Sequence, residues 1–238
     1  MAVKFCTYEG SEYKVAYNLI NPDCKKAIVF LHGWGSSKEL MQKAFAPYFK
    51  EYAHIYIDLP GFGKSNYYTP LTTPIYAKIV QQFLQQFDYE IEAVFGHSFG
   101  GKVATLLHPK KLVLLSSAGI VEPKPLKVRC KIALFKLLKP LKIAKIKRFF
   151  ISSDAKDMDA VMYQTFKNVV DEDFTNRFKN YNNKALVIWG KEDSATSIKS
   201  GKKIAALLPN SAFYPLEGDH YFFLHHPKTV EKIYYNNL

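Results

Sequence analysis

Residues 91–101 read IEAVFGHSFGG, and this stretch decides the fold. It places a G-x-S-x-G motif between an apolar run typical of a strand and a segment with helical spacing. So sharp a turn from strand to helix forces Ser98 into a strained backbone conformation, while Gly96 and Gly100 let neighbouring backbone approach closely. The Ser98 hydroxyl is then pushed into the open, beside the free N–H groups of a helix N-terminus. The stretch therefore predicts a nucleophilic serine, with an incidental serine in a tight turn as the alternative.

Other short apolar runs lie on both sides of this motif. Runs rich in Val and Ile that end at Gly, Asp or Ser are typical of strands buried on both faces. Including the run before Ser98, five such runs and a weaker sixth are found at 27–31, 55–57, 91–95, 112–115, 185–189 and 212–216. An earlier pair of runs, 3–8 and 12–18, predicts an antiparallel hairpin at the sheet edge.

Segments with helical spacing alternate with these strands, at 38–49, 74–87, 99–107, 198–208 and 229–235. Such alternation is typical of the α/β class, with a mostly parallel sheet covered by helices on both faces. The alternation stops between Gly119 and Tyr181, where helical spacing continues without a strand. We therefore expect one domain over 1–238, with a helical cap inserted at about 120–180 above the carboxyl ends of the strands.

A serine nucleophile needs a base and an orienting carboxylate. After a turn of this kind they follow along the chain in the order Ser, Asp or Glu, then His. Asp193 and His220 each follow a predicted strand, so both are expected at the same sheet edge as Ser98. The order predicts Ser98 as nucleophile, His220 as general base and Asp193 as the orienting carboxylate. Glu192 is the rival to Asp193, and Asp219 is interpreted as a residue that shapes the loop.

Two backbone N–H groups are needed to stabilise the oxyanion of acyl transfer. One is predicted at Phe99, directly after the nucleophile. The other is predicted at Trp34, because the glycines of LHGWG at 31–35 let that loop bend toward the pocket; an ordinary glycine-rich turn is the alternative. The loop DLPGFGKS at 58–65 lacks the spacing of a phosphate loop and is interpreted as a structural loop beside the pocket.

The histidines and cysteines give no sign of a metal site. The chain has seven histidines without HExxH spacing and three cysteines without CxxC spacing. We therefore predict no metal, and interpret all three cysteines as free thiols. The side chain of His97, inside the serine motif, is expected to turn toward a neighbouring strand or loop.

Together, HGWG, DLPGFGKS, GHSFGG, the Asp after the seventh strand and GDH before a final helix resemble the α/β-hydrolase superfamily, in particular its small cap-bearing serine hydrolases. The resemblance covers roughly residues 1–120 and 180–238. It implies an eight-stranded, mostly parallel sheet, a triad of Ser98, Asp193 and His220, and no cofactor.

The resemblance leaves several activities open. Hydrolysis of a small-molecule carboxylic ester through an acyl-enzyme is the main expectation. One alternative is cleavage of a carbon–carbon bond in a meta-cleavage product of the 2-hydroxy-6-oxo-dienoate type. Another is an esterase acting on an ester bound to an acyl carrier protein. A non-enzymatic ligand-binding or signalling protein on the same fold is the third.

Positive charge is concentrated in one segment. The chain of 238 residues has a net charge of +12, and residues 123–150 hold ten basic and no acidic residues. Only three of the 33 basic residues are arginine, the residue preferred for bidentate nucleic-acid contacts, so no nucleic-acid partner is predicted. The segment is interpreted as a cap with solvated lysines. Docking to an acidic carrier protein or substrate, or to anionic lipid, are the alternatives.

The hydropathy pattern excludes a membrane protein of the helical kind. No apolar run approaches the roughly 18 residues that a transmembrane helix needs, so no transmembrane segment is predicted. The first residues, MAVKFCT, lack the features of a signal peptide, and a cytoplasmic location is the expectation.

Overall fold

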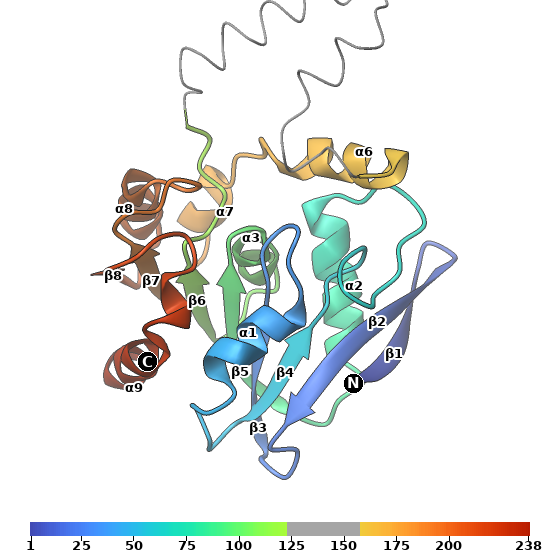
Figure 1. The fold of residues 1–238 in the computed structure, drawn as a ribbon, viewed down its shortest axis with the longest axis horizontal. Coiled ribbons are helices and arrows are strands. Elements are labelled where there is room, and N and C mark those ends of the chain that lie inside the picture. Colours follow the sequence, from blue (N-terminus) through green and yellow to red (C-terminus); the bar gives the residue numbers. More distant parts are fainter. Residues whose placement is uncertain (123–157) are drawn as a thin grey trace, which may run out of the picture.

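The computed structural model describes residues 1–122 and 158–238. In these residues eight strands form one sheet in the order β1-β2-β4-β3-β5-β6-β7-β8 (Figure 1). The strands are β1 (Ala2–Tyr8), β2 (Ser11–Ile20), β3 (Lys26–Leu31), β4 (Ala53–Ile57), β5 (Glu90–His97), β6 (Lys111–Leu115), β7 (Lys184–Gly190) and β8 (Ser211–Leu216). β2 pairs antiparallel with both β1 and β4, and all other neighbouring strands run parallel. The eight-stranded, mostly parallel sheet and its edge hairpin are thus confirmed.

Helices cover both faces of this sheet, as alternate residues of β3 show. Val29 and Leu31 belong to a core cluster with α2, α3 and α8, whereas Ile28 and Phe30 belong to a second cluster with α1, α9 and the short 3-10 helix η3. In Figure 1, α1 of the second cluster lies in front of the strands, and α9 lies beside them at the lower left. The helices are α1 (Lys38–Phe45), α2 (Thr73–Leu84), α3 (Phe99–Leu106), α8 (Ile198–Leu207), η3 (Phe222–Leu224) and α9 (Pro227–Asn237). The α/β class is therefore confirmed.

Two helices end earlier than predicted, and strand β8 is less buried than the prediction of strands buried on both faces implies. The helix expected over 38–49 ends at Phe45, and four residues later Phe49 has a positive φ of 51°, which no helix interior accommodates. The helix expected over 74–87 ends at Leu84. β8 is only partly buried along its length, because it has β7 as its one neighbour at the sheet edge.

Part of the predicted insertion lies within the described residues. Residues 158–180 contain α6 (Ala160–Val169) and α7 (Thr175–Lys179); in Figure 1 α6 lies above the upper end of α2, and α7 lies beside α8. Asp159 caps α6 by accepting the N–H of Met162 at 2.8 Å. The basic segment 123–150 lies outside the described residues, so the insertion as a whole stays a prediction.

A buried ion pair holds the glycine-rich loop after β4. The Nζ atom of Lys38 lies 2.6 Å from Oδ2 of Asp58, and neither side chain is exposed to solvent. Asp58 also accepts the backbone N–H groups of Lys38 and Lys64, at 2.8 and 2.9 Å. Ser65 at the loop's end donates its hydroxyl to the Asp58 carbonyl. The structural interpretation of DLPGFGKS is therefore confirmed.

We expect Lys38→Met to lower the free energy of unfolding by roughly 3–5 kcal/mol, because it leaves the buried Asp58 carboxylate without its counter-ion. Chemical denaturation with urea measures this loss. Lys110→Met is the matched control, since Lys110 pairs with Glu90 on an exposed surface and its removal should leave the unfolding midpoint nearly unchanged. Equal shifts for the two variants would contradict the assignment.

Candidate active site

Ser98 occupies the turn between β5 and α3 in a strained backbone conformation, with φ 51° and ψ −116°. Three backbone hydrogen bonds hold it there: its N–H donates to the Leu115 carbonyl, and its own carbonyl accepts the N–H groups of Gly101 and Ala118. A serine at a helix N-cap usually accepts a helix N–H, but the Ser98 side chain makes no such bond. Its hydroxyl is therefore left free for other chemistry, and the predicted strain is confirmed.

Two glycines of the motif are required by close approach of backbone. A Cβ at Gly96 would come within 2.5 Å of the Gly100 carbonyl oxygen, and one at Gly100 within 2.5 Å of the His32 carbonyl oxygen. Real side chains do not tolerate such contacts, so any other residue would displace the turn that carries Ser98. The helix that follows is thereby pressed against the carboxyl ends of β3 and β5.

Asp193 and His220 meet above the ends of β7 and β8. The Nδ1 atom of His220 lies 2.8 Å from Oδ2 of Asp193. The Asp193 side chain is fully buried, whereas the His220 side chain retains 14% exposure. Because Asp193 engages Nδ1, the Nε2 atom is the ring nitrogen left for a second partner. The structure therefore joins the predicted base to the predicted carboxylate.

The Asp193 carboxylate is held by a full set of donors. Oδ1 accepts the backbone N–H groups of Ala195 and Thr196 at 2.8 and 2.9 Å, and Oδ2 accepts the Thr196 hydroxyl at 2.9 Å. Burial by itself would raise the pKa of Asp193, but the hydrogen bonds from His220 and Thr196 outweigh it and lower the pKa to about 2. The carboxylate is thus charged at neutral pH and can stabilise an imidazolium.

The two rival carboxylates lie elsewhere. Oε2 of Glu192 accepts the N–H of Gly218, and the residue is exposed. Asp219, also exposed, accepts the N–H of Tyr221 at 2.8 Å, as expected of a residue that shapes the loop. Thr196 was not foreseen from the sequence. The signal that could have found it is the D-x-x-T spacing after Asp193, which favours a local side-chain-to-backbone turn.

The loop after β3 lies directly against the serine turn. A Cβ at Gly33 would come within 3.1 Å of the Ser98 Cβ. The Trp34 ring meets the Phe99 ring edge-on, with centroids 5.6 Å apart. The loop that holds Trp34 therefore lies next to Ser98 and Phe99. As the first residue of α3, Phe99 has an N–H without an intrahelical acceptor. The part of Trp34 and Phe99 in binding an oxyanion stays a prediction.

A cluster of aromatic side chains packs around Trp34 and Phe99, next to Ser98. The Trp34 ring packs against Phe62 from the loop after β4, at 4.9 Å between centroids, and against Phe166 of α6, at 5.3 Å. Tyr76 of α2 packs edge-on against Phe99 at 5.1 Å. Phe62, Tyr76 and Phe99 are buried, so these contacts fix the loop of Trp34 against the start of α3.

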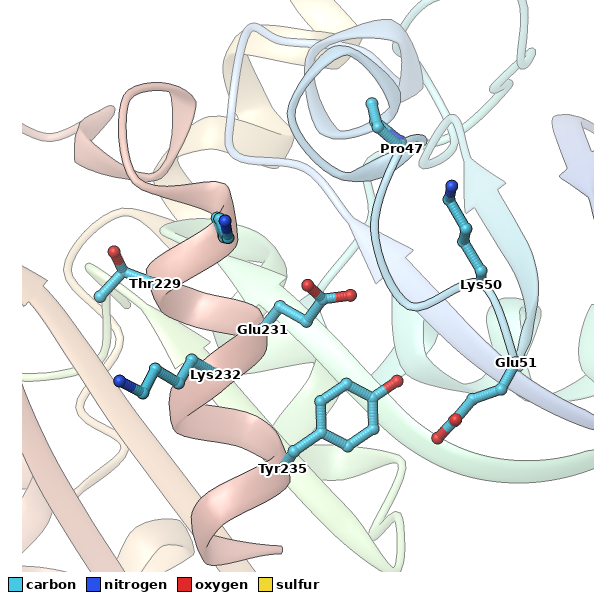
Figure 2. Close-up of a pocket in the computed structure, with 8 residues that line it drawn as sticks. Pro47, Lys50, Glu51, Thr229, Glu231, Lys232 and Tyr235 are labelled. Atoms are coloured by element: carbon cyan, nitrogen blue, oxygen red, sulfur yellow. The ribbon is translucent and has the colours of Figure 1, made fainter.

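A separate groove of about 930 Å³ lies between α9 and the segment after α1. Figure 2 shows Glu231 and Tyr235 of α9 facing Lys50 and Glu51 across it. None of the predicted site residues lines this groove. We therefore place the candidate site at the carboxyl ends of the strands and not here.

The described residues also bear on the predictions about metal sites, free thiols and transmembrane helices. In residues 1–122 and 158–238, no three His, Cys, Asp or Glu side chains gather as metal ligands would. Cys6 and Cys24 are free thiols, while Cys130 lies outside the described part. Among the described helices, none is long and apolar enough to cross a bilayer.

Comparison with known proteins shows the family of the chain. Residues 28–233 match the model of the alpha/beta hydrolase family. The chain is 27% identical over 233 residues to the uncharacterized hydrolase YugF of Bacillus subtilis, covering 81% of this chain and 82% of that one. A shorter match, 34% identical over 91 residues, is to the pimeloyl-[acyl-carrier protein] methyl ester esterase of Edwardsiella ictaluri, and covers 37% of this chain and 34% of that enzyme.

Solved structures share the fold. A thermophilic esterase from Thermogutta terrifontis superposes with a TM-score of 0.73 at 15% identity, over 99% of this chain and 97% of that one. The esterase EaEST from Exiguobacterium antarcticum superposes with a TM-score of 0.71 at 20% identity, over 94% and 95%. With the family match spanning most of its length, this chain belongs to the alpha/beta hydrolase family and is a hydrolase with esterase-like structural neighbours.

Proposed function

We propose that the protein is a serine hydrolase that cleaves a carboxylic ester through an acyl-enzyme. The observation that carries the proposal is the 2.8 Å contact between Asp193 and His220, together with a strained Ser98 whose hydroxyl does not cap its helix. A protein that only binds a ligand would not need a serine, a histidine and an aspartate in three separate loops at the carboxyl ends of the strands.

The first half of the reaction acylates the serine. His220 Nε2 takes the proton of the Ser98 hydroxyl while the oxygen attacks the ester carbonyl, and Asp193 stabilises the imidazolium that forms. The carbonyl oxygen becomes an oxyanion, which accepts hydrogen bonds from the N–H groups of Phe99 and Trp34. The intermediate then expels the alkoxide, which takes its proton from His220 and leaves as the alcohol.

The second half repeats these steps with water. His220 removes a proton from a water molecule, whose oxygen attacks the acyl carbon on Ser98. A second oxyanion forms at the same two N–H groups. It collapses as His220 returns the proton to Ser98, and a carboxylic acid is released. In this mechanism the chain's own residues and water carry out every step.

A series of p-nitrophenyl esters of graded acyl length tests the proposal. We expect measurable hydrolysis with a preference along the series, because acyl chains of different length bury different amounts of apolar surface when they bind. A fluorophosphonate probe should label the wild-type enzyme, and mass spectrometry should find the label on Ser98. An enzyme that neither hydrolyses the esters nor takes up the probe would refute the proposal.

We extend the proposal to a substrate class in which the ester is presented by an acidic carrier protein. Two observations favour it: the partial match to a pimeloyl-[acyl-carrier protein] methyl ester esterase, and the ten basic residues at 123–150 in the sequence. Attraction between opposite charges weakens as salt screens it. The KM for a carrier-bound ester should therefore rise with ionic strength, while the KM for a free p-nitrophenyl ester should not.

A further inference from the structure

His97, directly before the nucleophile, contacts the loop that carries His220. Its side chain comes from the end of β5 and is almost completely buried, with 1% of the residue exposed. Its Nε2 atom lies 3.0 Å from the backbone carbonyl oxygen of His220. A carbonyl oxygen can only accept a hydrogen bond, so the proton must sit on Nε2 of His97. The expectation that this side chain turns toward a neighbouring loop is confirmed.

The His97 ring is neutral, so its second ring nitrogen, Nδ1, carries no proton. Burial, together with the nearby His220, lowers the pKa of His97 to about 3. With the single proton on Nε2, Nδ1 is a bare acceptor, and among the described residues it has no hydrogen-bond partner. A buried polar atom without a partner is costly, so the orientation of this ring must be stabilised by the bond that Nε2 makes.

Contacts on two sides confine the His97 ring between site loops. Its centroid lies 4.6 Å from that of the His220 ring. On the other side a Cβ at Gly33 would come within 2.9 Å of Nδ1. The neutral His97 side chain thus contacts both the loop before Trp34 and the loop of His220. Its residue is also the direct chain neighbour of Ser98.

We propose that His97 is a positioning residue for the base: by donating Nε2–H to the His220 carbonyl, it fixes the backbone from which the His220 imidazole reaches Asp193. The inference rests on the proposed function for its kinetic consequence, but its structural consequence can be measured without any substrate. His97 exchanges no proton with the substrate and so is not a catalytic residue.

Three variants separate positioning from packing. His97→Phe keeps a ring of similar size and removes the donor, whereas His97→Gln places an amide N–H near the position of Nε2. His54→Phe is the matched control. His54 is also fully buried in a strand and lies 3.0 Å through Nε2 from a backbone carbonyl oxygen, that of Phe49, but it belongs to β4 and is outside the proposed site.

We expect His97→Phe to lower kcat by about 10- to 100-fold per active site titrated with a fluorophosphonate, with KM nearly unchanged. His97→Gln should recover most of this loss. His54→Phe should reduce thermal stability without changing kcat per titrated site. Titration is needed because a variant that merely packs badly lowers the active fraction and not the rate of each folded molecule.

The second readout is proton NMR of the His220 ring N–H that is bonded to Asp193. Such a proton resonates far downfield, and we expect it to broaden or disappear in His97→Phe while persisting in His97→Gln and His54→Phe. An unchanged resonance in His97→Phe would overturn the inference, as would a loss of kcat that His97→Gln shares in full. If the resonance responds but the wild type cleaves no ester, the proposed function fails and the positioning role stands.

Discussion

Ser98→Ala is expected to lower kcat toward p-nitrophenyl esters by at least about a thousandfold. The variant removes the attacking oxygen, and in related triads such a loss leaves only the rate that binding and oxyanion stabilisation provide. Alanine should occupy the strained turn no worse than serine, because the backbone bonds to Leu115, Gly101 and Ala118 do not involve the side chain. Steady-state kinetics and fluorophosphonate labelling of the purified variant measure the loss.

Ser211→Ala is the matched control for this prediction. Ser211 is also half-buried, but it lies at the start of β8, at the opposite ends of the strands from Ser98. Its hydroxyl donates to the carbonyls of Ala205 and Leu208, so its loss should affect stability alone. An undiminished rate in Ser98→Ala would remove the nucleophile assignment and, with it, the acyl-enzyme mechanism.

Asp193→Asn is expected to lower kcat by about 10³- to 10⁴-fold with little change in the fold. The reason is geometric. Oδ1 accepts the N–H groups of Ala195 and Thr196, so the amide oxygen of asparagine must take that place and its NH₂ group must face His220. His220 can then only accept at Nδ1, and its proton moves to Nε2, where it can no longer receive the proton of Ser98.

Asp219→Asn provides the control one residue from the base. Asp219 is exposed and accepts the N–H of Tyr221, a bond that the amide oxygen of asparagine can also accept. We expect kcat within about twofold of wild type, since the loop geometry is preserved. If both variants lost activity equally, the orienting role of Asp193 would be wrong, and the charge of the loop as a whole would be the better explanation.

The sequence predicted the sheet well because its signals are local. Each strand is a short apolar run, and the serine turn has a local motif in which Gly96 is required by a contact with Gly100, only four residues away. The order of Ser98, Asp193 and His220 could be predicted for a similar reason, since each follows a strand and parallel strands bring their carboxyl ends to one edge.

Features that depend on tertiary packing could not be predicted. Nothing in the local pattern around Lys38 marks it as a fully buried residue, because its burial depends on Asp58, twenty residues away. The contact of His97 with the carbonyl of His220 joins positions that are 123 residues apart. The end of the first helix also depends on packing, as Phe49 turns into the core with a positive φ.

The strand order also bears on how the protein is synthesised. Ser98 and its supports on β3, β5 and β6 lie in the first half of the chain, whereas Asp193 and His220 follow β7 and β8, at the far edge of the sheet. On the proposed mechanism, a nascent chain that has been synthesised only as far as β6 contains the nucleophile but not yet the base. Reactivity toward esters therefore requires that the chain has been synthesised past β8, as far as His220.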